Sequence, residues 1–206
     1  MSFVSADASG YEARIAASGC VATRDHNWHD LFNALTWLNY PRIKAAMNAR
    51  HCDEIARRPG GARGPVRDAL TQFDEDGLVL VSDDMALIDA LCGHRWREAL
   101  FDRRASASRA TLHVIGHALM EKAMSPHVGL CAKVLHLHAD DLPAGHEAFD
   151  AWLAVRIVDG RWPSGPRDLC PLPVLGLPGM TRDNTDAAYF DDTRQFRPLP
   201  AARMRT

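Results

Sequence analysis

The chain has 206 residues, a mass of 22.7 kDa and a formal net charge of −2. This length predicts one domain that buries about 70% of its unfolded surface and folds without a metal or disulfide. With 47% hydrophobic and 24% charged residues, the composition excludes a disordered chain, a collagen and a coiled-coil rod. These totals indicate the class of protein, but they do not indicate a reaction.

The basic residues are mostly arginines, since 21 of the 24 are Arg and three are Lys. Clustered arginines would indicate a phosphate or nucleic-acid surface, because the guanidinium fork binds phosphate well. In this chain they are scattered, and the sequence pI is about 6.5. We therefore expect no nucleic-acid partner.

Targeting, membrane and disulfide signals are missing from the sequence. The first twenty residues lack the basic and apolar regions of a signal peptide, and no stretch has the length of an apolar spanning segment. The cysteines are odd in number and form no C-x-x-C pair, which disfavours a disulfide framework and a zinc knuckle. We expect a cytoplasmic protein with no membrane partner, whose thiols are reduced and mostly buried: Cys20, Cys52, Cys92, Cys131 and Cys170.

Two adjoining helices are predicted in the first third of the chain. An apolar stripe at helical spacing predicts the first helix and its core side: Trp28, Leu31, Phe32, Leu35 and Leu38. Asn27 or Asp25 is expected to cap its start. Pro41 ends it and opens a second helix that runs to about Arg57.

The rest of the chain predicts short elements of both kinds. Residues 66–73 and 78–81 flank an Asp-Gly turn and predict a small antiparallel hairpin. Helices are expected near 85–92, 96–101, 111–124 and 149–158, and a strand at 133–138; Ser82-Asp83-Asp84 is expected to cap the first of these helices. From Arg161 the chain is Pro-rich and should be extended.

The predicted fold class is α+β, a mainly helical single domain with a small antiparallel hairpin and an extended Pro-rich C-terminal segment. Residues 1–24 are expected to be a loosely ordered N-terminal segment. Residues 25–206 are expected to form one compact domain that includes the wrapping C-terminal tail.

The first candidate site lies at the start of the first predicted helix. His29 and Asn33 are one helical turn apart and share a face beside the apolar stripe, and Asp30 follows His29 directly. Such residues at the rim of a core can be catalytic or metal-binding. They can equally satisfy backbone groups of neighbouring elements.

The second candidate is a row on the next helix formed by Lys44, Asn48 and His51. With His29 and Asn39, it loosely resembles the His-Asn-His nuclease finger. That fold places a β-hairpin before its helix, whereas here the first histidine lies in a helical pattern. We interpret the row as a solvated helix face.

The third candidate is His117 with Glu121, spaced i and i+4, and His113 one turn earlier. An imidazole and a carboxylate at this spacing can share a metal, or Glu121 can orient His117 as a base. A zinc site would need a further ligand such as His29. The alternative is a buried, hydrogen-bonded histidine in an apolar helix.

The acidic run Asp74-Glu75-Asp76 is a fourth candidate, placed by the predicted hairpin at a turn. Its order lacks the ligand spacing of a calcium loop. We interpret these residues as turn-forming.

Residues 27–51, NWHDLFNALTWLNYPRIKAAMNARH, are distinctive, as are the segments around Arg67-Asp68, around Gly116-His117 and in the tail PLPVLGLPGM. On these stretches the chain resembles a bacterial family of uncharacterised proteins, domain of unknown function number three thousand and twenty-five, over about residues 25–198. The resemblance implies a single compact domain that includes the tail, and no activity.

Two classes of function stay open from the sequence. One is a small-molecule or phosphoester hydrolase whose catalytic residues are His29, Asp30, Asn33, His117 and Glu121. The other is a non-catalytic ligand-binding or protein-interaction module. A divalent metal fits the first class, although no ligand spacing indicates one. The expected partner is a small molecule.

Overall fold

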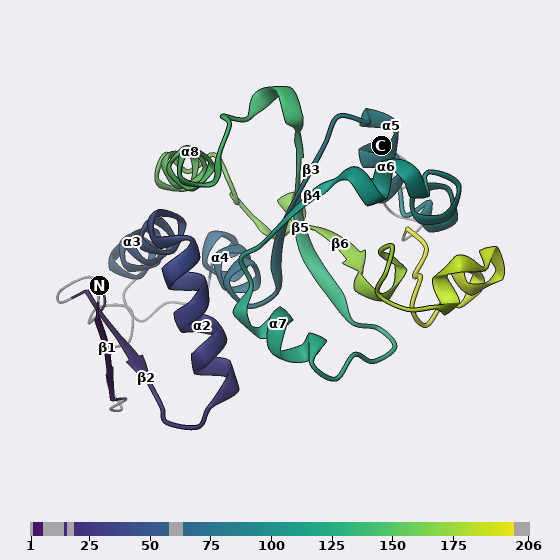
Figure 1. The fold of residues 1–206 in the computed structure, drawn as a ribbon. Coiled ribbons are helices and arrows are strands. Elements are labelled where there is room, and N and C mark those ends of the chain that lie inside the picture. The colour runs from purple at the N-terminus through teal and green to yellow at the C-terminus, as the bar shows by residue number, and fades with distance from the viewer. Residues whose placement is uncertain (1, 6–14, 16–18, 58–63, 200–206) are drawn as a thin grey trace. The chain divides into compact units, whose positions relative to one another are not determined.

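A computed structural model describes residues 2–5, 15, 19–57 and 64–199 (Figure 1). Helices predominate, accompanied by a small mixed sheet, and the predicted α+β class is confirmed. By their internal contacts, the described residues within 1–77, 114–121 and 142–169 form one unit. Those within 78–113, 122–141 and 170–199 form a second unit. The predicted single compact domain stays a prediction.

In the first unit, helix α3 (Pro41–Arg57) packs against α2 (Trp28–Asn39) and against α8 (His146–Val158). Asn27 caps α2, as predicted, by accepting from the Asp30 backbone N–H at 2.9 Å. The buried Asp150 of α8 accepts the backbone N–H groups of Arg42 and Ile43 at 3.0 and 2.9 Å. These bonds fix α8 against the start of α3, because they satisfy N–H groups that no intrahelical carbonyl can reach.

Strands β1 (Ser2–Ser5) and β2 (Cys20–Thr23) pair in parallel within the predicted loose segment 1–24. The other residues of that segment, Ile15, Gly19 and Arg24 excepted, lie outside the described residues. Their predicted loose order stays a prediction.

Helix α2 presents a different side to the core from the predicted one. Trp28 and Leu38 of the apolar stripe are 56% and 67% exposed. Asp30, Asn33, Thr36 and Trp37 are buried in their place. The prediction was wrong because polar groups on the other side of the helix find partners in the fold, so hydrophobicity alone did not select the buried face.

The predicted hairpin is a helix followed by a strand. Helix α4 covers Pro65–Asp76, and strand β3 covers Gly77–Ser82 with every residue buried. The run contains Val66, Ala69, Leu70 and Phe73 at i, i+3, i+4 and i+7. That is helical spacing. Pro65 stands in the first turn, where a proline costs no hydrogen bond.

The predicted helix over 111–124 also divides into two elements. Strand β4 covers Thr111–Val114, and helix α7 covers His117–Ala123. His113 therefore lies on a strand and does not share a helix with His117.

The second unit contains a four-stranded sheet of order β4-β3-β5-β6. Strand β5 (Cys131–His138) confirms the predicted strand, and it pairs antiparallel with β6 (Cys170–Pro173). Helix α5 (Met85–Cys92) is capped by Asp84, as predicted, and packs against β6. Near Trp96 the predicted helix is a short π-helical turn (Glu98–Asp102) followed by α6 (Arg104–Arg109).

The Pro-rich tail joins this sheet and continues as short 3-10 turns (Val174–Gly176, Asp183–Thr185, Ala187–Asp191). Asn184 is fully buried, and its amide donates to the Leu175 and Leu177 carbonyls at 3.0 and 2.6 Å. Among the described residues, no helix combines the length and apolarity needed to cross a bilayer.

Candidate metal centre

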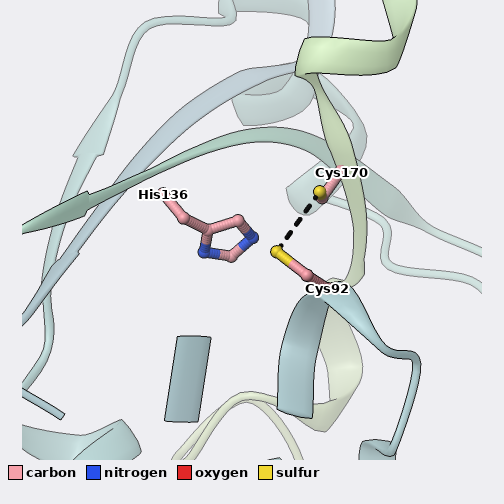
Figure 2. A group of neighbouring side chains, drawn as sticks. All are labelled: Cys92, His136 and Cys170. Carbon is pink, nitrogen blue, oxygen red and sulfur yellow. Dashed lines mark hydrogen bonds between the residues drawn. The ribbon is translucent and has the colours of Figure 1, made fainter. Parts of the chain in front are cut away.

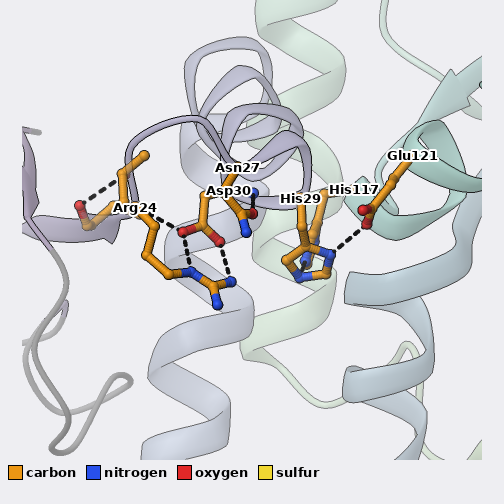
Figure 3. Close-up of polar contacts among 8 residues, drawn as sticks. Arg24, Asn27, His29, Asp30, His117 and Glu121 are labelled. Atoms are coloured by element: carbon orange, nitrogen blue, oxygen red, sulfur yellow. Dashed lines mark hydrogen bonds and ion pairs between the residues drawn. The ribbon is translucent and has the colours of Figure 1, made fainter.

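Two histidines from distant parts of the sequence meet in the first unit. His29 lies in the first turn of α2, and His117 is the first residue of α7. Their rings lie edge to face, with centroids 4.4 Å apart. Their Nε2 atoms are 3.0 Å apart, so the two imidazoles direct the same nitrogen at a common point (Figure 3).

Gly116 determines where His117 begins its helix. A Cβ at this position would lie 2.3 Å from the Gly77 backbone nitrogen. The Gly116 N–H donates to the Gly77 carbonyl at 2.8 Å, and the Ile115 N–H donates to the same oxygen at 3.0 Å. The glycine therefore allows a close backbone approach that brings α7 to the end of α4.

Each imidazole faces a carboxylate with its other nitrogen. Glu121, one turn after His117 on α7, lies 2.9 Å from His29 Nδ1 (Figure 3). Asp74, in the last turn of α4, has an oxygen 3.8 Å from His117 Nδ1. Carboxylates behind both rings are the arrangement that orients metal-binding histidines in proteins.

Lys44 of α3 holds the Asp74 carboxylate in place. Its ammonium group forms an ion pair with Asp74, lies 5.4 Å from the centre of the Trp37 ring and is 3% exposed. The lysine charge is thus compensated by a carboxylate and an aromatic face, as a buried charge requires.

Burial raises the pKa of the Asp74 carboxyl, but Lys44 and then His117 outweigh it, and the pKa lies below its usual value. For His117, burial dominates and lowers the pKa to about 4. At neutral pH Asp74 is therefore an anion and His117 a neutral imidazole, the form that binds metals.

The positions of the ring protons follow from these contacts. A carboxylate only accepts hydrogen bonds, so His29 carries its proton on Nδ1, toward Glu121. If His117 carries its proton on Nε2, the lone pair on its buried Nδ1 faces the negatively charged Asp74. That arrangement is repulsive. If the proton is on Nδ1, the two Nε2 lone pairs face each other and need a cation between them.

Glu75 adds a third donor to the two histidines. One ligand atom each from His29, Glu75 and His117 lies within 4.8 Å of the others. Two imidazoles and one carboxylate are a donor set of catalytic zinc sites, in which a fourth position is kept for water or substrate. His29 and Glu121 have side chains 34% and 42% exposed, so solvent reaches this side of the group.

Comparison with known proteins places the chain in a family. The model of a family described as a protein of unknown function, DUF3025, matches residues 1–200. The chain is a member of the DUF3025 family. No curated protein and no solved structure matches it. Membership confirms the resemblance seen in the sequence, and the family description assigns no reaction.

The DUF3025 fold brings together three of the five predicted catalytic residues, His29, His117 and Glu121. Asp30 is engaged elsewhere, because it accepts from the Arg24 side chain at 2.8 and 2.9 Å and from the Arg24 backbone at 2.7 Å. It joins the end of β2 to the start of α2. Asn33 is buried one turn after His29, and its role in the site stays a prediction.

Three residues of the centre were missed or misinterpreted from the sequence. Lys44, with Asn48 and His51, was interpreted as a solvated face, yet the three are 3%, 6% and 7% exposed. Asp74 and Glu75 were assigned to a hairpin turn and instead end helix α4. The helical spacing of residues 66–73 was the signal that would have placed both carboxylates on a helix.

Proposed function

We propose that this DUF3025 protein is a metal-dependent hydrolase of small esters or phosphoesters, with its metal held by His29, His117 and Glu75. The observation that carries the proposal is the convergence of two Nε2 atoms 3.0 Å apart, each on a ring backed by a carboxylate. Zinc is the metal that this donor set suits best.

The chemistry of the proposed centre follows from the roles of its residues. A zinc ion with three protein ligands lowers the pKa of a bound water to about 7 and polarises an ester or phosphoryl oxygen. Glu121 keeps the His29 Nδ1 proton in place, so Nε2 presents its lone pair. Asp74 is held by Lys44 and lies 3.8 Å from His117 Nδ1, so its negative charge favours a proton on that nitrogen. Held by His29, His117 and Glu75, the ion would supply a nucleophilic water and an electrophilic centre for the hydrolysis of an ester or phosphoester.

The test uses full-length protein purified without an affinity tag. Metal content is measured by mass spectrometry, and turnover of p-nitrophenyl acetate, p-nitrophenyl phosphate and bis-p-nitrophenyl phosphate is followed with zinc and with manganese. We expect hydrolysis of at least one ester that chelation abolishes and zinc or manganese restores.

His29→Ala tests the centre itself, because this side chain is 34% exposed and its loss should leave the fold intact. It should remove the metal-dependent turnover, whereas His127→Ala, at an exposed position, should not. Turnover that survives His29→Ala, or a protein that binds neither metal, would contradict the proposal. Two histidines and a carboxylate also hold ferrous iron in oxygenases. If the protein consumes oxygen only when loaded with ferrous iron, the proposal of a hydrolase is replaced by that of an oxygenase.

A further inference from the structure

A second group of ligand-type side chains lies in the second unit, formed entirely by residues of that unit. Cys92 is the last residue of α5, His136 lies on β5 and Cys170 begins β6 (Figure 2). The two sulfur atoms are 3.4 Å apart. One ligand atom from each of the three residues lies within 4.8 Å of the others.

The sheet explains why two of these residues meet. In the antiparallel pair, Cys170 lies opposite Val134. Side chains alternate along a strand, so His136 emerges on the same face as Val134, diagonal to Cys170. Helix α5 packs against β6 and brings Cys92 to this face from its last turn. All three positions are therefore set by regular elements, which hold a ligand more precisely than loops do.

His136 is the residue that points to a ligand. Both ring nitrogens are buried, and neither makes a hydrogen bond of acceptable geometry. A buried imidazole without partners is costly, because it gives up its bonds to water and gains none. Figure 2 shows the ring directed toward the two sulfurs.

We propose that Cys92, His136 and Cys170 bind a thiophilic divalent metal, with zinc as the physiological ion. Two sulfur donors and one imidazole are a zinc donor set, and with three protein ligands the fourth position stays open to water or a substrate atom. A bound ion gives one His136 nitrogen the partner it lacks and replaces the proton between the sulfurs. Zinc binding therefore releases thiol protons and is coupled to pH. A pair of cysteines that serves only to form a disulfide has no need of the histidine.

Cobalt(II) is the probe, because it replaces zinc and reports thiolate ligands by sulfur-to-metal charge-transfer absorption. Reduced, metal-free, full-length protein titrated with cobalt should develop these bands, and zinc should abolish them. Cys92→Ser, Cys170→Ser and His136→Asn should each reduce the bands strongly. The matched controls Cys131→Ser and His138→Asn, on the same strand β5, should leave them unchanged.

A second measurement on the wild-type protein guards against variants that fail to fold. Zinc should protect Cys92 and Cys170 from alkylation by iodoacetamide, mapped by mass spectrometry, and leave the labelling of Cys52 unaffected. Absence of thiolate bands together with absence of protection would overturn the proposal. A Cys92–Cys170 disulfide that forms in air and excludes metal would overturn it in favour of a redox pair.

Variants should remove the two proposed metal sites independently of each other. His117→Ala should remove the first site and leave the cobalt–thiolate bands intact. Cys170→Ser should remove the bands and leave the ester turnover assigned to His29 and His117. Loss of both by either variant would show that the assignments to separate centres are wrong.

Discussion

His29 and His117 lie 88 positions apart in the sequence, and their Nε2 atoms are 3.0 Å apart. A carboxylate faces the opposite nitrogen of each ring, Glu121 at 2.9 Å and Asp74 at 3.8 Å. If both neutral histidines direct their Nδ1 protons at the carboxylates, the lone pairs on their two Nε2 atoms face each other. The four side chains together therefore favour a cation at the Nε2 atoms.

Glu121→Gln should weaken metal binding at this centre without unfolding the protein. The amide can still contact His29 Nδ1, but it no longer supplies the negative charge that raises the basicity of the ring. Loss of such a supporting carboxylate costs about 10–100-fold in metal affinity. The affinity is measured by competition with a chromophoric zinc chelator. Glu147→Gln, on the exposed face of α8, is the control, and equal affinities of the two variants would contradict the assigned role.

Lys44→Met should destabilise the fold, because it leaves the Asp74 charge beside an apolar chain. Removing one member of a buried pair costs roughly 3–5 kcal/mol. Asp74 retains 28% exposure, so we expect the low end, about 3 kcal/mol, in the free energy of unfolding measured by urea denaturation. The double variant Lys44→Met/Asp74→Leu should recover much of this loss. A double variant less stable than Lys44→Met would show that the ion pair is not the reason.

Gly116→Ala should disturb the first metal centre through the backbone. The added methyl group would lie 2.3 Å from the Gly77 nitrogen, so α7 must shift and carry His117 with it. We expect a lower melting temperature and a loss of zinc affinity. Gly165→Ala is the matched control, since its nearest neighbour is 3.8 Å away at Pro65. Unchanged zinc affinity in Gly116→Ala would mean that the close approach does not position His117.

Asp150→Ala should expose how much the junction of α3 and α8 contributes to stability. The change leaves the Arg42 and Ile43 N–H groups without their carboxylate acceptor. An unsatisfied buried donor costs about 1–3 kcal/mol. Thermal unfolding compares this variant with Asp159→Ala at the exposed end of the same helix. A difference within measurement error between the two would contradict the capping role.

Asp84→Asn should destabilise the protein at neutral pH and not in strong acid. The Asp84 pKa is lowered first by a hydrogen bond from Ser106 and then by the Leu87 backbone N–H. A carboxylate with a lowered native pKa stabilises the fold above its unfolded pKa, and this contribution disappears as the pH falls through the native value. The difference in melting temperature from wild type should close over that window. Asp83→Asn, at an exposed neighbour, should show no such pH dependence.

Much of the helical framework could be predicted from local patterns. The cap at Asn27, the break at Pro41 and the cap at Asp84 depend on a few neighbouring residues, and all three are confirmed. The segment after Gly64 was misassigned although Val66, Ala69 and Phe73 have helical spacing. The Asp-Gly pair that follows it favoured a hairpin turn and outweighed that spacing. Because of that error, Asp74 and Glu75 were assigned to a turn and were not recognised as residues of the candidate site.

Sequence alone also failed to show which side of α2 is buried. The apolar side carries Trp28 and Leu38, both exposed. The buried side carries Asp30 and Thr36, whose polar groups are satisfied by Arg24 and by the Phe32 carbonyl. Such partners are invisible to a hydrophobic pattern, because the pattern measures transfer from water and takes no account of the bonds that replace water.

By itself, the sequence determined the α+β class, the family and the local starts and ends of several helices, because each depends on residues close together in the chain. It also singled out His29, His117 and Glu121. Only the tertiary structure decided that these three meet, and that Cys92, His136 and Cys170 form a second group. The physical reason is that metal-type centres are defined by distances of a few ångströms between side chains. Those distances are set by helix packing and strand register across long stretches of the chain.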